Sequence, residues 1–591
     1  MNIKLLLTLS CSIAFVESFS QQTVITMIPN IPFERDNNYS VEYQELIRFY
    51  KEVAEVSELV RVDEVGVTDS GYPLHTVVVS DYKQETPQTA NSKNKLIVFI
   101  NNGIHPGEPC GIDASMIFVR DLVVGAIDQN VLNNVVFVIV PVYNIGGMLN
   151  RGSFSRANQN GPAEYGFRAN ARNYDLNRDF IKADTENTRS FHRIFNYWNP
   201  HVFIDTHTSN GADYQYIMTL ITTQKDKLPS PMKEFLQEKM LPHLFEAMLK
   251  DGFEMTPYVN SRGIPDNGIV EFLDTPRYST GYTALHHCYG FMTEAHMLKT
   301  FKERVYATLS FIKAVASFCN SNKDEIIQSK KEAIQEYLKA NEVPIRWEFA
   351  KDKADTITFK GYRADYKKSA VTGYDRLFYD RSQPKTMKIP YYHHYESSLN
   401  ITTPTAYIIP KKEKQLINRL IDNGVYVETL MREKIVEVEV YKITSYQSSN
   451  TVYEGHFPHN GVEVKTELKQ KLLESGDYII NTWQDKKRFI IETLEPQAHD
   501  SYFTWNFFDS YLSQKEYFSA YVFEDLAEEL LKTDPLLKEK FEHAISSDEQ
   551  LRSNPQKQLE FIYVNSPYYE SETHRVYPIY RFFGDIHQLT E

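Results

Sequence analysis

Four continuous apolar runs constrain the fold of this 591-residue chain more than any other feature. They are rich in β-branched residues and lack apolar–polar alternation, which is typical of strands buried on both faces of a sheet. Segments with apolar residues at helical spacing, such as 112–127 and 231–250, lie between them. The runs are KLIVFINNG (95–103), NVVFVIVPVYN (134–144), HVFIDTH (201–207) and GFMTEAHML (290–298). This order predicts an α/β fold with a mostly parallel mixed sheet flanked by helices.

Two of these runs lead to a histidine. His105 follows the first run, with Glu108 three residues later, and His207 ends the third run. Pro106 and Gly107 make the HPGE segment a turn rather than a helix. Ligands of open α/β sheets bind at the carboxyl ends of strands, so both histidines are expected at one edge. Two imidazoles and one carboxylate can hold a catalytic zinc ion and leave a position open for water, which predicts a hydrolase.

The segment ARNYDLNRDF (171–180) carries groups suited to bind an anion. Asn177 and Arg178 offer an amide and a planar guanidinium that can hold a carboxylate through two hydrogen bonds. Arg172, with Arg168 as the alternative, supplies a second cation for the oxygen of a carbonyl under attack. A solvated arginine-rich loop is the competing interpretation of this segment.

Glu294 lies in the fourth apolar run, between Thr293 and Ala295. Burial in such a strand raises the pKa of a carboxyl group, which suits a group that takes up a proton and later returns it. A buried carboxylate paired with an arginine is the alternative interpretation.

The order of these motifs, H-x-x-E, then D-L-N-R, then a histidine and a glutamate at strand ends, resembles the zinc carboxypeptidases of the carboxypeptidase A/B family. The resemblance covers roughly residues 40–315. It implies that one zinc ion per chain is bound by His105, Glu108 and His207, and that the C-termini of peptides or proteins are the substrate.

The resemblance also implies roles for residues around the zinc ion. Asn177 and Arg178 would hold the terminal carboxylate of the substrate, Arg172 would polarise the scissile carbonyl, and Glu294 would be the general base. Asp175 matches the family carboxylate that orients the first zinc histidine, and such partners fix the tautomer of a ligand.

Two positions depart from the family pattern. Gly107 stands where members with the H-x-R-E form have an arginine that helps to bind substrate, so that role is unfilled or supplied from elsewhere. The family tyrosine that closes over the substrate is matched best by Tyr278 in RYSTG, with Tyr282 as the alternative.

The N-terminus has the layout of a secretory signal peptide over residues 1–20. Lys4 precedes an apolar run, and the small residues Ser18 and Ser20 follow it. We expect export to the periplasm or the medium, as in a secreted bacterial enzyme, without stable membrane insertion. Cys11 follows a sequence that matches a lipoprotein box poorly, which argues against a lipid anchor.

The remaining chain divides by composition. Residues 21–320 are predicted to form the catalytic domain, 321–342 a solvated helical connector, and 343–591 a β-rich or α+β accessory region with a helix near 521–531. After cleavage three cysteines remain, which allow at most one internal disulfide: Cys110, Cys288 and Cys319.

Composition and the remaining histidines narrow the function classes. The net charge of -14, without a long Lys/Arg block, excludes sequence-independent binding to nucleic acid as a leading hypothesis. Histidine pairs are usually surface or packing residues, and we interpret five histidines in this way: His286, His287, His296, His393 and His394.

Two other functions compete with a secreted metallocarboxypeptidase. An amidohydrolase of the succinylglutamate desuccinylase or aspartoacylase type would share the H-x-x-E zinc site and also bind carboxylates. A non-catalytic binding protein with a relic zinc site is the other, although a complete ligand set and a candidate base argue against it. The sequence leaves side-chain specificity and oligomeric state open.

Overall fold

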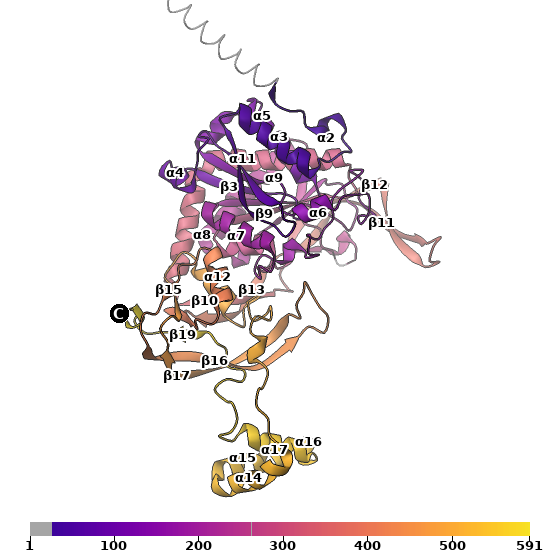
Figure 1. Ribbon diagram of the computed structural model, residues 1–591. Coiled ribbons are helices and arrows are strands. Elements are labelled where there is room, and N and C mark those ends of the chain that lie inside the picture. Colours follow the sequence, from indigo (N-terminus) through magenta and orange to yellow (C-terminus); the bar gives the residue numbers. More distant parts are fainter. Residues whose placement is uncertain (1–26, 262, 591) are drawn as a thin grey trace, which may run out of the picture.

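The computed structural model describes residues 27–261 and 263–590; the predicted signal peptide lies outside these ranges. In this described part, eight strands form a central sheet with the order β1-β2-β4-β3-β5-β9-β6-β7 (Figure 1). The strands are β1 (Val60–Val67), β2 (Pro73–Val79), β3 (Leu96–Asn101), β4 (Val135–Val140), β5 (Val202–Ser209), β6 (Met218–Thr222), β7 (Met255–Pro257) and β9 (Tyr289–His296).

The centre of the sheet is parallel. Strands β4, β3, β5 and β9 pair in parallel, whereas β2 joins β4 and β6 joins β9 in antiparallel fashion. The four apolar runs form these four central strands, and the predicted fold class is confirmed. Because the register pairs Asn101 with Asp205 and His207 with Glu294, the polar carboxyl ends of three strands lie at one edge.

Helices cover both faces of the sheet, which explains why the runs do not alternate. On β3, Val98 and Ile100 belong to one hydrophobic cluster and Ile97 and Phe99 to the other. The first cluster includes α3 (Tyr43–Val56), α5 (Cys110–Val123), α8 (Ser230–Phe235), α9 (Leu241–Lys250) and α11 (Phe301–Lys339). The second includes α7 (Glu186–Trp198) and α10 (Ser279–Leu285).

Helix α11 differs from the solvated connector that the polar sequence after 320 indicates. It begins at Phe301 and continues to Lys339, with a kink at Asn322. Ile326 and Ala333 in its second half are fully buried. This segment is therefore the end of a long packed helix that leads into the C-terminal region, which we define as residues 342–590.

In the C-terminal region, six of the described strands form a sheet with the order β15-β18-β14-β19-β16-β17. Its elements are β10 (Glu342–Phe349), β13 (Tyr395–Thr402), β14 (Ala406–Ile409), α12 (Lys414–Asp422), β15 (Glu428–Thr429), β16 (Lys434–Ser448), β17 (His459–Leu473), β18 (Tyr478–Asn481), α13 (Lys487–Leu494) and β19 (Tyr580–Phe582). Helices α12 and α13 share the second hydrophobic cluster with α7 and α10, so this region packs directly on the N-terminal half, which we define as residues 27–341 and which contains the central sheet.

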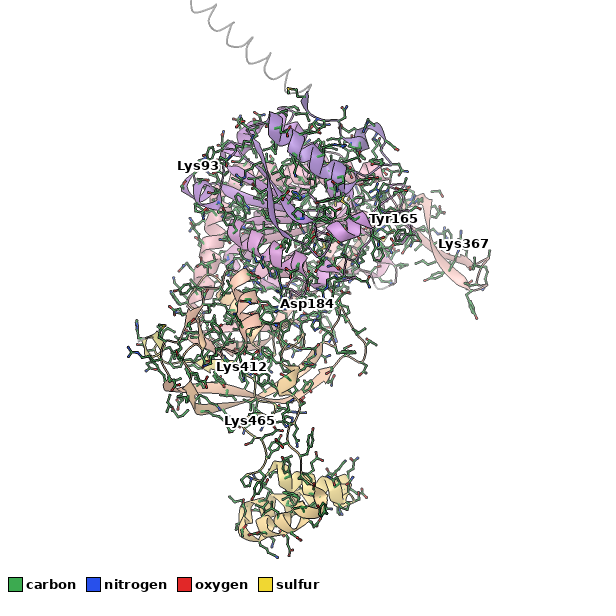
Figure 2. All side chains as sticks on the ribbon, viewed as in Figure 1. Lys93, Tyr165, Asp184, Lys367, Lys412 and Lys465 are labelled. Carbon is green, nitrogen blue, oxygen red and sulfur yellow. The ribbon has the colours of Figure 1, made fainter. Side chains whose placement is uncertain are left out.

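Two parts project from this body (Figure 1). The hairpin of β11 (Asp355–Lys368) and β12 (Asp375–Tyr392) extends into solvent, with Lys367 near its tip (Figure 2). A small helical module with its own hydrophobic cluster is connected to the body by two chain segments. Its helices are α14 (Ala520–Thr533), α15 (Pro535–Ser547), α16 (Glu549–Arg552) and α17 (Pro555–Val564).

The cysteines of the described ranges, Cys110, Cys288 and Cys319, are buried and unpaired. Within these ranges, no helix combines the length and the apolar character needed to cross a bilayer.

Candidate active site

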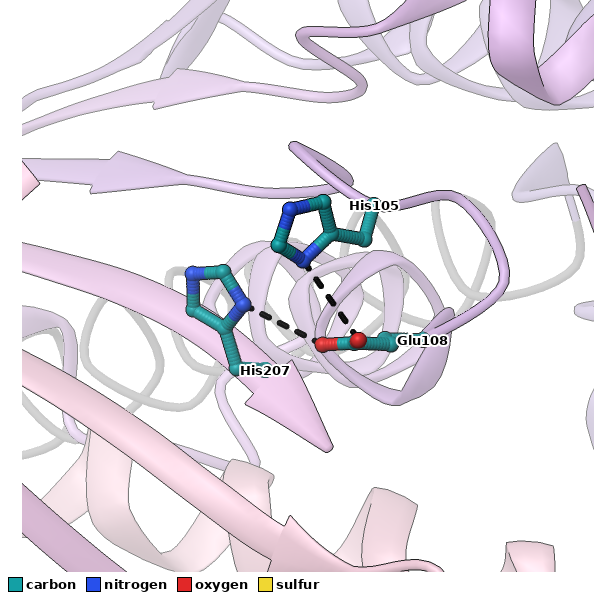
Figure 3. Close-up of side chains that lie close together, drawn as sticks. All are labelled: His105, Glu108 and His207. Carbon is teal, nitrogen blue, oxygen red and sulfur yellow. Dashed lines mark hydrogen bonds and ion pairs between the residues drawn. The ribbon is translucent and has the colours of Figure 1, made fainter. Parts of the chain in front are cut away.

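Three predicted zinc ligands meet at the carboxyl edge of the central strands (Figure 3). His105 and Glu108 lie in the turn between β3 and α5, which is closed by a hydrogen bond from the Glu108 amide to the His105 carbonyl, and His207 lies on β5. Nδ1 of His105 is 3.4 Å from Glu108 Oε1, and Nδ1 of His207 is 3.1 Å from Glu108 Oε2. All three side chains are buried, and their ligand atoms lie within 4.8 Å of one another. This group could hold one metal ion.

A carboxylate orients each of the two imidazoles. Asp175 lies 2.9 Å from Nε2 of His105, the relationship that the sequence resemblance implies. Asp205 lies 3.0 Å from Nε2 of His207. Each carboxylate can accept the Nε2 proton of its ring, and this makes Nδ1 of both rings, the atoms nearest Glu108, the candidate metal ligands.

The donor atoms of His105, Glu108 and His207 are suited to a metal ion. Nδ1 of His105 is buried without a hydrogen-bond partner, which is costly unless a cation is bound there. Burial lowers the pKa of His207, but the Asp205 and Glu108 carboxylates outweigh burial and raise it well above its usual value. The carboxylates of Asp205 and Glu108 therefore stabilise positive charge at the His105–Glu108–His207 group.

The three candidate ligands line a cleft with a volume of about 600 Å³, and Glu294 lines the same cleft. It lies on β9 beside His207 of β5, and its side chain is buried. Burial raises the pKa of the Glu294 carboxyl to about 8, against the opposing effect of His207. The group is thus a weak acid placed next to the three candidate ligands, as a proton acceptor for water would need to be.

The predicted carboxylate-binding residues line another part of this cleft. Asn177 and Arg178 lie in the short helical turn that follows Asp175, and Tyr278 directly precedes α10. The Arg178 guanidinium carbon is 4.6 Å from the centre of the Tyr278 ring. Asn177 Oδ1 accepts a hydrogen bond from the Ser279 amide at 3.2 Å, which ties the two segments together. Tyr282, the alternative to Tyr278, is instead fully buried in the core.

The structure corrects the expectation for Arg172. Its Nη1 donates to the carbonyl of Asp184 at 3.0 Å and lies 3.6 Å from Asp69, and its side chain is 49% exposed. Arg168 lines the cleft instead, 3.7 Å from Glu108. The reason is the tight turn between them, in which Asn170 Oδ1 accepts from the amides of residues 172 and 174.

Arg156 is a further cleft residue that the sequence motifs do not indicate. Its Nη1 donates to Glu108 Oε1 at 2.9 Å. A Cβ atom on Gly107 would lie only 2.8 Å from Arg156 Cδ, so the Arg156 side chain crosses the space beside Gly107. An arginine thus reaches the vicinity of position 107 from a distant loop.

Of the cleft residues that the sequence analysis did not name, Asp205 has a recognisable sequence pattern and Arg156 has none. Asp205 could have been found, because residues two apart on a strand share a face and Asp205 precedes His207 by two. Arg156 lies in an irregular stretch without periodicity or motif. Apart from the residues discussed above, the cleft is lined by Ser155, Ala157, Asn158, Thr208, Ser209, Asn210, Ile221, Tyr258, Asn260, Phe272, Met292 and Met297.

The remaining histidines differ in their surroundings. Burial lowers the pKa of His286 and His287 well below the usual value, as expected for packing residues. Among described residues, Asp355, His393 and His394 form a second group with metal-compatible spacing. Lys225 Nζ lies 3.1 Å from His394 Nδ1 and donates to it, which leaves the proton of a neutral ring on Nε2, 3.6 Å from Asp355. Hydrogen bonding accounts for this second group.

Comparison with known proteins agrees with this geometry. Residues 46–215 match the zinc carboxypeptidase family, Peptidase_M14. The chain is 22% identical over 405 residues to probable carboxypeptidase 2 of Arthroderma benhamiae, covering 65% of this chain and 70% of that protein. It is also 22% identical over 406 residues to carboxypeptidase 2 of Trichophyton rubrum, covering 65% and 68%.

Solved structures give weaker overall similarity. A metallo-carboxypeptidase from Burkholderia cenocepacia has a TM-score of 0.36 and 17% identity, covering 48% of this chain and 70% of the other. The carboxypeptidase A of Helicoverpa armigera has a TM-score of 0.37 and 15% identity, covering 49% and 75%. The family assignment comes from the sequence matches.

Residues 46–215 therefore match a zinc carboxypeptidase domain, which belongs to the class of zinc-dependent peptide hydrolases. The sequence resemblance is confirmed at this level. The family acts on peptide substrates.

Proposed function

We propose that this protein is an exported metallocarboxypeptidase that removes C-terminal residues from peptides, with one zinc ion per chain. The observation that carries the proposal is that one cleft holds a buried His105–Glu108–His207 group, the carboxyl of Glu294, and Arg178. These are the parts that hydrolysis of a terminal peptide bond requires: a metal site, a base, and an anchor for a carboxylate.

Glu294 is proposed as the general base. A bound zinc ion supplies Lewis acidity, which makes water acidic enough to be deprotonated near neutral pH. The Glu294 carboxylate takes that proton and passes it to the leaving amine nitrogen. Support comes from its burial beside His207 and from its raised pKa, which suits a group that is protonated and deprotonated in one cycle.

Asn177, Arg178 and Tyr278 are proposed to bind the substrate end. A guanidinium and an amide can hold a carboxylate through two charge-assisted hydrogen bonds. The Tyr278 ring packs against Arg178 and keeps its guanidinium within the cleft. A free C-terminus is thereby distinguished from an interior peptide unit, which has no negative charge.

Arg168, rather than Arg172, is proposed to polarise the scissile carbonyl of the substrate. Its guanidinium is held by Asp175, with Nε 2.9 Å from Oδ2, and it faces the cleft beside Glu108. A fixed cation at this place stabilises negative charge that develops on the carbonyl oxygen. Asp175 and Asp205 orient the two imidazoles.

A peptide panel with varied C-terminal residues tests the proposal. We expect stepwise release of free amino acids, loss of release with a chelator, recovery on adding zinc, and about one zinc per chain by elemental analysis. Arg178→Ala should raise KM by about 10–100-fold, the value of a lost charged hydrogen bond. Cleavage of N-acyl amino acids alone, with no action on unblocked peptides, would replace the proposal with the amidohydrolase alternative.

Export is proposed from the N-terminal sequence. The mature protein recovered from expressing cells should begin near Gln21, which N-terminal sequencing measures. A retained Met1 in exported protein, or a protein confined to the cytoplasm, would contradict it.

A further inference from the structure

The C-terminal region reaches the two cleft segments that are proposed to bind the substrate carboxylate. The loop between β16 and β17 has a tight turn at its tip, residues 453–456. Tyr453 and His456 exchange a pair of backbone hydrogen bonds across this turn. Both central residues of this turn have positive φ, 48° at Glu454 and 79° at Gly455, as in the type I′ turns of β-hairpins. A positive φ is unfavourable for glutamate, so the choice of residue here calls for an explanation.

The Glu454 carboxylate supplies that explanation. It accepts a hydrogen bond from the backbone amide of Asp175 at 2.9 Å, across 279 residues of sequence. Asp175 in turn contacts both His105 and Arg168. In the same turn Gly455 lies against the Tyr174 ring, where a Cβ would be 2.9 Å from the hydroxyl. The turn therefore covers the start of the Asp175–Arg178 segment.

A second contact fixes the residue next to Tyr278. Arg277 donates to Asp500 from its side chain, with Nε 2.9 Å from Oδ1, and from its backbone amide at 2.9 Å. The Asp500 side chain is fully buried; burial raises its pKa, but Arg277 outweighs burial and holds the pKa below its usual value. Arg277 is thus anchored to the C-terminal region by both its backbone and its side chain.

Trp505 joins the two contacts. It is fully buried, with the Arg277 guanidinium carbon 4.7 Å and the Lys182 ammonium 5.5 Å from its ring. Lys182 lies just beyond the Asp175–Arg178 segment and pairs with Asp184. Figure 2 shows Asp184 at the boundary between the N-terminal half and the C-terminal region. His456 also binds Asp184, at 2.8 Å.

We propose that Glu454, Asp500 and Trp505 are positioning residues of the active site: the C-terminal region holds the Asp175–Arg178 segment and the Tyr278 segment at the spacing that a substrate carboxylate needs. The inference rests on the proposed function. The N-terminal half alone would retain its metal ligands, because those are fixed by strand ends and by the turn after β3, but it would lose the alignment of Arg178 and Tyr278.

Glu454→Gly separates positioning from folding. Glycine accepts the positive φ without strain, so the turn and the global stability are kept or improved while the acceptor for the Asp175 amide is lost. We expect KM to rise about ten-fold and kcat to change less than about three-fold, with unchanged zinc content and an unfolding temperature at or above that of wild type. Glu454→Gln should restore KM, because its amide oxygen still accepts that hydrogen bond.

The matched control is Glu474→Gln, which removes an exposed ion pair with Lys411 in the same region and should leave all parameters unchanged. Asp500→Asn, which weakens the hold on Arg277, should raise KM in the same direction. A wild-type KM for Glu454→Gly would overturn the proposal, and so would a raised KM that Glu454→Gln fails to restore.

Hydrogen exchange keeps the test independent of activity. Amides in 170–182 should exchange faster in Glu454→Gly and those in 272–286 faster in Asp500→Asn, relative to wild type and Glu474→Gln. Faster exchange in a protein that releases no amino acid from any peptide would sustain the positioning role and remove the proposed function. Unchanged exchange with normal peptide release would do the reverse.

Discussion

The metal side and the carboxylate side of the cleft differ in where their support comes from. His207 and Glu294 lie on paired strands, and His105 and Glu108 lie on the turn that follows a third, so the sheet register itself brings them together. Arg178 and Tyr278 lie outside the strands, and the segments that carry them are held by residues as far away as Glu454. The candidate metal ligands are thus placed by the central sheet, whereas the placement of the carboxylate-binding residues also depends on the C-terminal region.

This difference predicts two classes of variant. Changes on the metal side should act on kcat or on zinc binding, and changes on the carboxylate side should act on KM.

Glu294→Gln should lower kcat by about 10²–10⁴-fold, the usual worth of a general base. The amide has nearly the same size and cannot accept the proton, so zinc content and KM should stay close to wild type. Steady-state kinetics and elemental analysis measure the three quantities. Retention of full kcat would remove Glu294 from the mechanism, and loss of zinc would show that it supports the metal instead.

Arg168→Ala should lower kcat by about 10²–10³-fold, because a fixed cation near the carbonyl oxygen is lost. Since Arg168 also holds Asp175, zinc content must be measured in the same sample. Arg168→Lys keeps the charge but loses the planar hydrogen bonds, and should recover only part of the rate. A rate unchanged in Arg168→Ala would leave the carbonyl without its proposed partner.

Prediction from sequence succeeded and failed along the same division. The strands and the group His105, Glu108 and His207 follow from continuous apolar runs that stop at polar residues, which is local information. Asp175 was placed correctly beside His105 by the resemblance. The fold class needed only the order of the runs.

The failures have a physical cause in loops and long-range contacts. Arg172 and Arg168 are four residues apart, and the Asn170 turn together with their partners, Asp175 for Arg168 and Asp184 for Arg172, determines which one faces the cleft. Arg156 and Glu454 act through contacts that no local pattern encodes. The polar surface of 320–341 also hid its buried positions, since a long helix can be polar on one side and packed on the other.

Asp205→Asn should weaken zinc binding by about ten-fold, at the lower end for partners of metal ligands, because asparagine still accepts the His207 hydrogen bond but carries no charge. Titration with a competing chelator measures the affinity. With zinc in excess, KM should match wild type, which separates this change from those on the carboxylate side. Unaltered zinc affinity would show that Asp205 only packs beside His207.

Arg172→Ala should have the smallest effect, within about two-fold in kcat and KM. Its side chain is half exposed and lies 3.6 Å from the buried Asp69 carboxylate, outside the cleft and away from the candidate metal ligands. The variant is the natural control for Arg168→Ala, because both remove one positive charge from the same turn. If the two variants lost activity equally, the charge of the turn rather than the position of one guanidinium would govern the reaction. A large loss in Arg172→Ala alone would return the carbonyl-binding role to Arg172 and require the 168–174 turn to rearrange when substrate binds.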